Sequence, residues 1–135
     1  MRPTSRAALA AVALVLGLAA VAATVSHTAT PQLTASQAAQ HVGERATVCG
    51  QVASTRYADW VRGRPTFLNL GRPYPRQLFT VVIWGEDRGN FDRPPEVTFE
   101  NRRICVTGKI GSYRATPQII VRRPKQIVVV DTRGQ

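Results

Sequence analysis

The chain has 135 residues, of which 44% are hydrophobic, and its 18 Lys and Arg against 8 Asp and Glu give a formal charge of +10. Once a leader is set aside, about 110 residues remain, which suffices for one modest domain and excludes two. Arginine outnumbers lysine 16 to 2, which suits polyanion binding because guanidinium groups pair bidentately with phosphate. A compositionally biased genome, or a role of charge in solubility, explains the same excess.

The first residues have the three parts of a secretory leader. Arg2 and Arg6 form a basic start, residues 7–23 (AALAAVALVLGLAAVAA) are apolar throughout, and Ala20 and Ala22 supply a small-residue exit. A run of about 17 residues also lies at the lower limit of what spans a bilayer, so an uncleaved membrane anchor is the alternative, and a buried core helix is a third. With the basic residues inside, either export interpretation places the rest of the chain outside the cytoplasm.

The leader, residues 1–23, is followed by a short polar tether, residues 24–33, and we expect one domain over residues 34–131. At its start the sequence TASQAAQHVG predicts one short helix. Thr34 or Ser36 can cap it, its alanines recur at helical spacing, and Gly43 can end it in the left-handed conformation.

Every later apolar segment has the pattern of a strand. These segments are residues 46–57, 65–71, 77–85, 102–113 and 117–123, with an extension at 126–131. The segments between them are rich in Pro, Gly and Asp. Four or five strands of this length predict an all-β fold, namely a small barrel or sandwich.

Two of these strands carry a glycine on their apolar face. Val48, Gly50 and Val52 share one face of the first strand, and Ile104, Val106, Gly108 and Ile110 share one face of the fourth. A glycine there lets the strand coil and the opposite wall of a small barrel approach. The alternation then points Cys49 and Cys105 outward.

The two cysteines of an exported protein favour one disulfide, because no metal-ligand cluster accompanies them. If the first and fourth strands are neighbours, Cys49–Cys105 is an inter-strand bridge on the outer face. Closing a loop of about 56 residues should stabilise by on the order of 4 kcal/mol in the chain-entropy model. The alternatives are two unpaired thiols and a catalytic or metal-binding role.

Several segments together resemble a known group of domains. The phrases are VCGQV, TFLNLG, VVIW, FDRPPE and CVTGKI followed by PQI, and they extend over about residues 35–130. In these features the chain is similar to the small OB-fold domains of exported bacterial proteins, which also occur appended to extracellular nucleases of the thermonuclease and YhcR type. The resemblance implies a five-stranded OB-fold barrel, preceded here by the short helix and the signal or anchor helix, with the first strand beside the fourth.

The resemblance also implies a ligand that crosses the second and third strands between the loops at residues 57–64 and 111–116. We expect a face of aromatic and basic side chains there that binds single-stranded nucleic acid or another polyanion. Its residues are Tyr57, Trp60, Arg62, Arg64, Phe67, Asn69, Trp84, Tyr113 and Arg114. For each aromatic the alternative is structural packing; Trp84 can lie beneath residues 91–97, and Phe91 and Phe99 are expected to cover the core.

We expect no enzymatic activity, no cofactor and no metal. The sequence has no Ser/His/Asp set, no HExxH and no phosphate-binding glycine loop, and the catalytic half of a thermonuclease is missing. Glu86, Asp87 and Asp92 lie in one turn without the periodicity of a calcium loop, so a solvated turn is the better interpretation.

Two functions of different classes follow. The first is an exported, non-catalytic binding module for single-stranded nucleic acid or another polyanion. The second is an envelope interaction module, tethered to the membrane by an uncleaved N-terminal helix, that binds a protein, glycan or lipid partner. Since a barrel of this kind leaves few uncovered edges, we expect a monomer.

Overall fold

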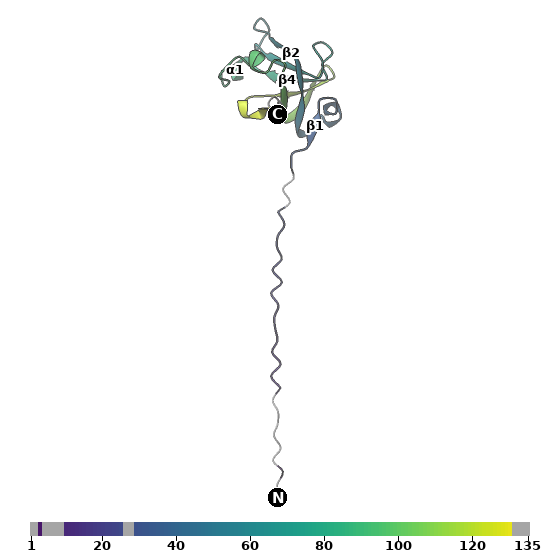
Figure 1. The fold of residues 1–135 in the computed structure, drawn as a ribbon, viewed down its shortest axis with the longest axis vertical. Coiled ribbons are helices and arrows are strands. Elements are labelled where there is room, and N and C mark those ends of the chain that lie inside the picture. The colour runs from purple at the N-terminus through teal and green to yellow at the C-terminus, as the bar shows by residue number, and fades with distance from the viewer. Residues whose placement is uncertain (1–2, 4–9, 26–28, 131–135) are drawn as a thin grey trace, which may run out of the picture.

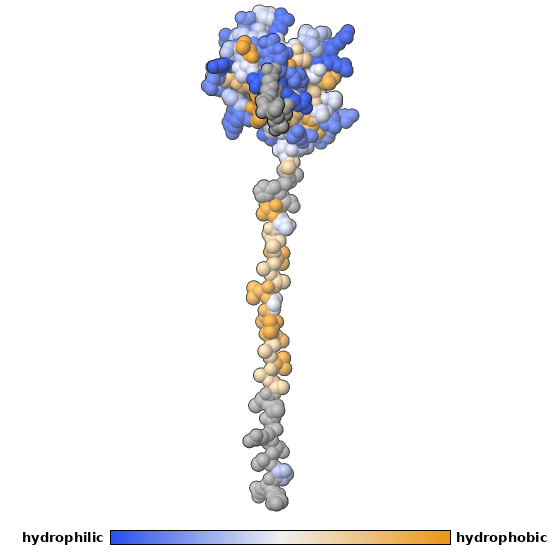
Figure 2. Space-filling view, viewed as in Figure 1, coloured by the Kyte–Doolittle hydropathy of each residue, from blue (hydrophilic) through white to orange (hydrophobic). Residues whose placement is uncertain are grey.

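The structure is a computed structural model that describes residues 3, 10–25 and 29–130. Residues 10–25 carry no helix or strand, and their apolar side chains are exposed (Figures 1 and 2). The described part of this segment therefore lacks the predicted leader helix. Short helices depend on tertiary packing for their stability, and these exposed side chains provide little of it. No helix among the described residues is long and apolar enough to cross a membrane. Arg2, Arg6 and the predicted domain end at residue 131 lie outside the described residues.

Residues 29–130 form a mostly β structure with one mixed sheet (Figure 1). Its strands are β1 (Gln32–Thr34), β2 (Arg45–Tyr57), β3 (Thr66–Leu70), β4 (Phe79–Ile83), β5 (Arg103–Tyr113), β6 (Thr116–Ile120) and β7 (Ile127–Val129). Single-turn helices lie between them: η1 (Ala38–His41), α1 (Gly85–Arg88), α2 (Pro95–Thr98) and η2 (Pro124–Gln126). Each predicted strand is present, and the extension at 126–131 contains β7.

The sheet turns back on itself because its two longest strands have several partners. β2 pairs antiparallel with β5 over residues 45–51 and with β3 over residues 52–57. From β3 the pairing runs through β4 and the parallel strand β6 to residues 110–113 of β5. β2, β3, β4, β6 and β5 thus make a partly closed ring, in which the first and fourth predicted strands are neighbours as expected.

The hydrophobic core lies inside this ring and uses one face of each strand. Its buried side chains include Val48, Val52, Leu68, Leu70, Phe79, Val81, Ile83, Ile104, Val106, Ile110 and Ile119. Val48, Val52, Ile104, Val106 and Ile110 are the inward positions that the alternation predicts, and this prediction is confirmed. Burying a side chain of this size stabilises by about 1.5–3 kcal/mol, so the shared inward face holds the ring together.

Gly50 and Gly108 lie where the opposite wall of the core comes close. A Cβ on Gly108 would lie 2.7 Å from Cγ2 of Ile119, and one on Gly50 would lie 3.3 Å from Cδ2 of Leu70. Each glycine precedes by one or two residues the point at which its strand leaves the shared β2–β5 pairing. The close approach predicted at both glycines is confirmed.

The two cysteines form a disulfide across β2 and β5. Cys49 and Cys105 are register partners, with an S–S distance of 2.03 Å and a sequence separation of 56. They lie on the side away from the core, beside a hydrogen bond between the hydroxyls of Thr47 and Thr107 (2.7 Å). Cys49 is nevertheless only 7% exposed, because it lies on an inner strand between β1 and β5 with its sulfur partner over it. The disulfide is compatible with an extracytoplasmic location.

The short helix predicted at residues 34–43 differs from the structure. Its first residue ends β1, which pairs in parallel with β2 and buries Leu33 opposite Val48. A turn follows, and only the single-turn η1 is helical before Gly43 leaves it with φ +95°. Burying Leu33 and pairing with β2 outweigh the weak preference of so short an alanine segment for a helix.

The segment between β4 and β5 covers one end of the ring. α1 and α2 lie in it, where the sequence shows turn residues and a Pro-Pro pair. Phe99 belongs to the core and Phe91 packs against it, with the two rings edge to face at 6.3 Å. The expectation that these two aromatics cover the core is confirmed.

Candidate functional site

The side of β3, β4 and β6 that points away from the core is here called the outer face. Strand registers arrange its residues in two rows that cross the strands. The polar row contains Ser54, Asn69, Thr80 and Gln118, and the apolar row contains Phe67, Val82 and Ile120 with Arg56 at its β2 end. Phe67 and Asn69 lie on this face as expected, and Thr80 and Val82 share it.

A bulge at Ala53 decides which residues of β2 join this face. The register shifts between the pairs Val52↔Leu70 and Ser54↔Asn69, so the alternation of β2 changes phase there. Arg56 consequently points outward beside Phe67. Tyr57 points toward the core side opposite the buried Thr66. The expectation that Tyr57 lies on the ligand face is therefore wrong.

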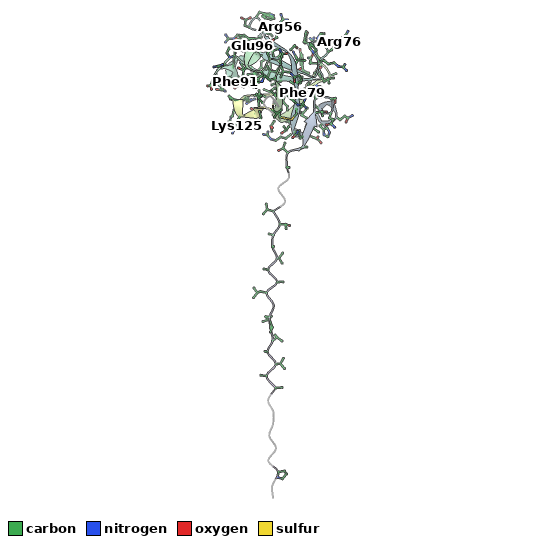
Figure 3. All side chains as sticks on the ribbon, in the orientation of Figure 1. Arg56, Arg76, Phe79, Phe91, Glu96 and Lys125 are labelled. Atoms are coloured by element: carbon green, nitrogen blue, oxygen red, sulfur yellow. A yellow bond between two sulfur atoms is a disulfide. The ribbon has the colours of Figure 1, made fainter. Side chains whose placement is uncertain are left out.

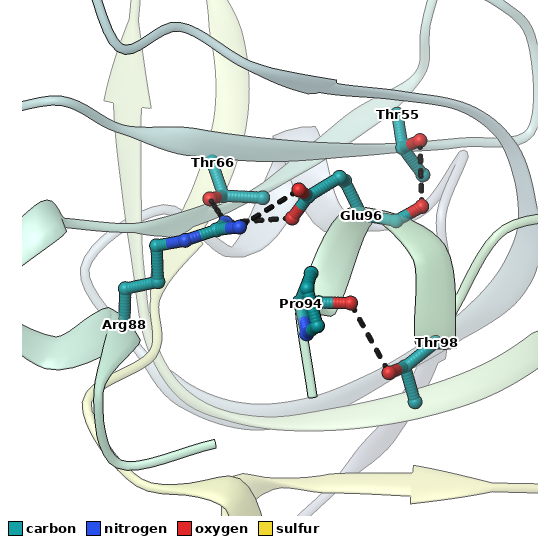
Figure 4. A network of polar contacts seen from close by, with 6 residues as sticks. All are labelled: Thr55, Thr66, Arg88, Pro94, Glu96 and Thr98. Atoms are coloured by element: carbon teal, nitrogen blue, oxygen red, sulfur yellow. Dashed lines mark hydrogen bonds and ion pairs between the residues drawn. The ribbon is translucent and has the colours of Figure 1, made fainter. Parts of the chain in front are cut away.

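Tyr57 lies instead against Arg88, which belongs to a polar network with Thr66 and Glu96 (Figure 4). The Arg88 guanidinium lies 3.7 Å from the centre of the Tyr57 ring. It donates to both carboxylate oxygens of Glu96, at 2.6 and 2.8 Å, and to the Thr66 hydroxyl at 2.8 Å. The Thr55 hydroxyl donates to the Glu96 carbonyl at 2.9 Å. One face of the Tyr57 ring is thus covered by the Arg88 guanidinium.

The Arg88–Glu96 pair shifts both ionisations. The hydrogen bonds from Arg88 hold the pKa of Glu96 below its ordinary value, although partial burial acts the other way. The bond to Glu96 raises the pKa of Arg88. Both side chains are 20% exposed, so the pair is a partly buried clamp between α1 and α2. It is a structural element, and it fixes the end of the ring next to the β2–β3 loop.

The polar row is closed by its own hydrogen bonds. Asn69 is 3% exposed, and its amide donates to the Ser54 hydroxyl at 3.1 Å and accepts from the Thr80 hydroxyl at 3.4 Å. Gln77 donates to Thr80 at 3.2 Å, and the Tyr74 backbone N–H donates to Ser54 at 3.0 Å. Residues 71–78 thus lie over this row, and Asn69 does not present its amide to solvent.

The β2–β3 loop, residues 58–65, places an aromatic ring at one end of the outer face. Trp60 is 65% exposed, and the Arg56 guanidinium lies 4.9 Å from its ring centre; Figure 3 shows Arg56 at the edge of the domain. Arg62 and Arg64 on the same loop are exposed. The Ala58 backbone N–H donates to the Pro65 carbonyl at 2.9 Å, and this hydrogen bond closes the loop at its base.

Trp84 packs against this loop. A Cβ on Gly63, whose φ is +81°, would lie 2.9 Å from Cε3 of Trp84, so only glycine fits there. The Gly85 N–H donates to the Gly63 carbonyl at 2.8 Å. A depression of about 460 Å³ lies between Gly63, Arg64, Trp84, Gly85 and Glu86. Trp84 is half-buried there and supports the loop that carries Trp60.

Tyr113 and Arg114 lie at the opposite end of the same face. Tyr113 pairs with Thr116, which precedes Gln118 by two residues on β6, so its side chain shares the outer face. It is 61% exposed, with the Arg114 guanidinium 5.4 Å from its ring centre. Arg114 and Ala115 have φ of +49° and +65°, as a two-residue hairpin turn requires.

The outer face therefore presents two exposed aromatic rings, each under an arginine, with half-buried Phe67 between its ends. Arg56 is the member that sequence reasoning missed, because the bulge that turns it outward leaves no clear sign in the residues. In the part of the chain that the structure describes, the ion pairs are His41–Glu44 and Arg88–Glu96, which leaves Arg56, Arg62, Arg64 and Arg114 without carboxylate partners. Within the same described residues, no three His, Cys, Asp or Glu gather to hold a metal.

No protein-family model matches the chain, and no curated protein matches it. Two solved structures are similar in backbone. One is an aspartyl-tRNA synthetase from Leishmania major Friedlin, with 13% identity and a TM-score of 0.47 over 83% of this chain and 23% of that one. The other is the OBody AM1L10 bound to hen egg-white lysozyme, with 16% identity and a TM-score of 0.40 over 69% and 84%. This chain thus spans about a quarter of the length of the synthetase.

Proposed function

We propose that this protein is a non-catalytic, exported binding module with an OB-type five-stranded barrel, which holds single-stranded nucleic acid or another polyanion on its outer face. One observation carries the proposal: Trp60 and Tyr113, 65% and 61% exposed, lie at opposite ends of one sheet face, each with an arginine over its ring. Exposed aromatics interleaved with arginines are what a single strand requires.

We expect the exposed rings and the arginines to contribute to binding in different ways. Each exposed ring offers one face to a base, a stacking contact that contributes about 1–3 kcal/mol, while the arginine on its other face stays close to the phosphates. Arg62, Arg64 and Arg114 neutralise backbone charge. Trp84 and Asn69, which the sequence also suggests as contacts, hold the loop and the strands in position.

The test is the affinity of the full chain, kept in solution by a nonionic detergent, for a fluorescent dT12 oligonucleotide as salt is raised. Trp60→Ala and Tyr113→Ala should each weaken binding roughly 5- to 150-fold, the equivalent of one stacked base. Replacing Arg62, Arg64 and Arg114 together by Gln should reduce the salt slope by up to about 2, at about 0.7 per phosphate contact.

Val128→Ala is the control, since Val128 is 55% exposed but lies on β7, which pairs with β5 away from the outer face. It should leave the affinity within about twofold. No binding by the wild-type chain at low salt, or an equal loss in Val128→Ala and Tyr113→Ala, would contradict the proposal.

The second candidate is the membrane-tethered interaction module, and the exposed apolar side chains of residues 10–25 favour it. It predicts that the intact mass of exported protein retains the leader and that envelope extracts yield one partner whether or not they are treated with nuclease. Partners that vanish after nuclease treatment would exclude it.

A further inference from the structure

A second group of cations lies where β2, β5 and β6 meet, outside the residues that the sequence suggests as contacts. Arg45 and Lys109 are register partners on β2 and β5, so their side chains leave the same face side by side. Arg122 lies two residues after the end of β6. All three are exposed, and they line a shallow cleft of about 380 Å³ with Gly111, Gln118 and Ile120.

The described residues supply no carboxylate partner for the charges of this cleft. Among residues 29–130, none of these three cations forms an ion pair with a carboxylate. Like charges directly opposite each other on neighbouring strands destabilise a sheet, and here Arg45 faces Lys109 without relief. A bound anion would remove this repulsion.

Hydrogen bonds within the protein also hold the backbone of this cleft in place without a ligand. Gln126 accepts hydrogen bonds from the backbone N–H groups of Arg122 and Arg123, at 2.9 and 3.0 Å, and donates to the Thr107 carbonyl at 3.1 Å. One amide thus ties the chain after β6 to β5 and fixes the backbone that carries Arg122. Gly111, which lacks a side chain, leaves the floor open beside Gln118.

The cleft continues the outer face without a break. Gln118 and Ile120, which line it, are the last members of the polar and apolar rows on β6. From Arg56 on β2 the apolar row crosses three strand intervals of about 4.8 Å, roughly 14 Å, before it reaches the cleft. A single-stranded nucleic acid that stacks on Trp60 and Phe67 and crosses β3, β4 and β6 would therefore reach Arg122 and Lys109.

We propose that the cleft between Arg45, Lys109 and Arg122 binds phosphate groups of the bound strand, so that the ligand crosses β3, β4 and β6 and ends over the start of β2. This inference rests on the proposed function and adds the direction and the far end of the binding path.

The test compares two double variants of the full chain that lose equal charge. They are Lys109→Gln/Arg122→Gln in the cleft and a control, Arg93→Gln/Arg103→Gln, at exposed positions away from the outer face. The ligand is fluorescent dT12, and affinity is measured against salt in nonionic detergent. The cleft variant should bind at least tenfold more weakly at low salt, with a salt slope lower by about 1.4 for two lost contacts. The control variant should keep the wild-type slope, and Lys109→Arg should keep wild-type affinity.

Folding of both double variants is checked by thermal unfolding, where loss of Lys109 should not lower the midpoint because it relieves the repulsion with Arg45. If the wild-type chain binds and both double variants lose the same affinity, charge alone acts; the inference is overturned while the proposed function stands. The same holds if the cleft variant binds like wild type. If the wild-type chain binds no oligonucleotide, the proposed function fails, and the inference with it.

Discussion

At the scale of single residues, Gly108 is a position where the packing leaves no room for a side chain. Gly108→Ala would place a methyl group 2.7 Å from Cγ2 of Ile119. We expect a loss of about 1–3 kcal/mol in the free energy of unfolding, the usual effect of overpacking a core. Urea denaturation at neutral pH measures it.

Gly111→Ala provides the matched control on the same strand. A Cβ there would lie 4.0 Å from the nearest atoms of Gln118, which is ordinary contact. Its free energy of unfolding should stay within about 0.5 kcal/mol of wild type. If both variants lost the same free energy of unfolding, the clash with Ile119 would not be the cause of the loss in Gly108→Ala.

At the scale of elements, the Arg88–Glu96 clamp joins α1 to α2 and both to β3 through Thr66. Glu96→Gln should destabilise the fold by about 1–2 kcal/mol at pH 7, since it removes a charge-assisted hydrogen bond. The pKa of Glu96 is lower in the folded state, so its contribution is complete above the unfolded-state pKa and disappears as pH falls through the folded-state pKa.

The difference between wild type and Glu96→Gln should accordingly shrink as pH is lowered from 5 toward the acid limit, as followed by urea unfolding at several pH values. Glu100→Gln removes an exposed carboxylate nearby and should leave stability almost unchanged at every pH. A difference between wild type and Glu96→Gln that stays constant down to the lowest pH would show that the carboxylate charge is not what stabilises the clamp.

The elements also show what can be predicted from sequence. Inward residues such as Leu68 and Val81 follow from simple alternation, and the outward position of Phe67 follows with them. The bulge at Ala53 is invisible in the residues, and without it Tyr57 and Arg56 exchange faces. β1 escapes prediction because its three residues contain a single apolar side chain and depend on β2 for their pairing.

The candidate site divides in the same way. Exposed Trp60 and Tyr113 could be found because Trp60 lies on a loop and Tyr113 is the last residue of β5, next to a turn that the strand pattern delimits. The burial of Asn69 depends on how residues 71–78 fold back over the sheet, and the cleft at Lys109 depends on long-range register between β2 and β5. Neither can be read from neighbouring residues, because both are set by contacts between distant parts of the chain.

At the scale of the whole molecule, the Cys49–Cys105 bridge closes a covalent loop of 56 residues that includes β3, β4, α1 and α2. Reduction should lower the free energy of unfolding by about 4 kcal/mol in the chain-entropy model, a large share of the 5–15 kcal/mol typical of a domain. Urea midpoints with and without dithiothreitol measure the effect.

The variant Cys49→Ser/Cys105→Ser should resemble the reduced protein and respond to dithiothreitol not at all. A midpoint that is the same for oxidised and reduced wild-type protein would refute the assigned role of the bridge. The comparison belongs at this scale because the entropy in question is that of the entire unfolded chain.

The position of the bridge also makes disulfide formation depend on the correct register of β2 and β5. Cys49 and Cys105 face each other only in the register that pairs Val48 with Val106. A slip of one residue would send the two thiols to opposite sides of the sheet, and a slip of two would separate them by nearly 7 Å along the strand, at the limit of what a disulfide spans. A chain that pairs β2 and β5 in the wrong register thus keeps two free thiols. A chain with the correct register can form the disulfide, which then fixes that register.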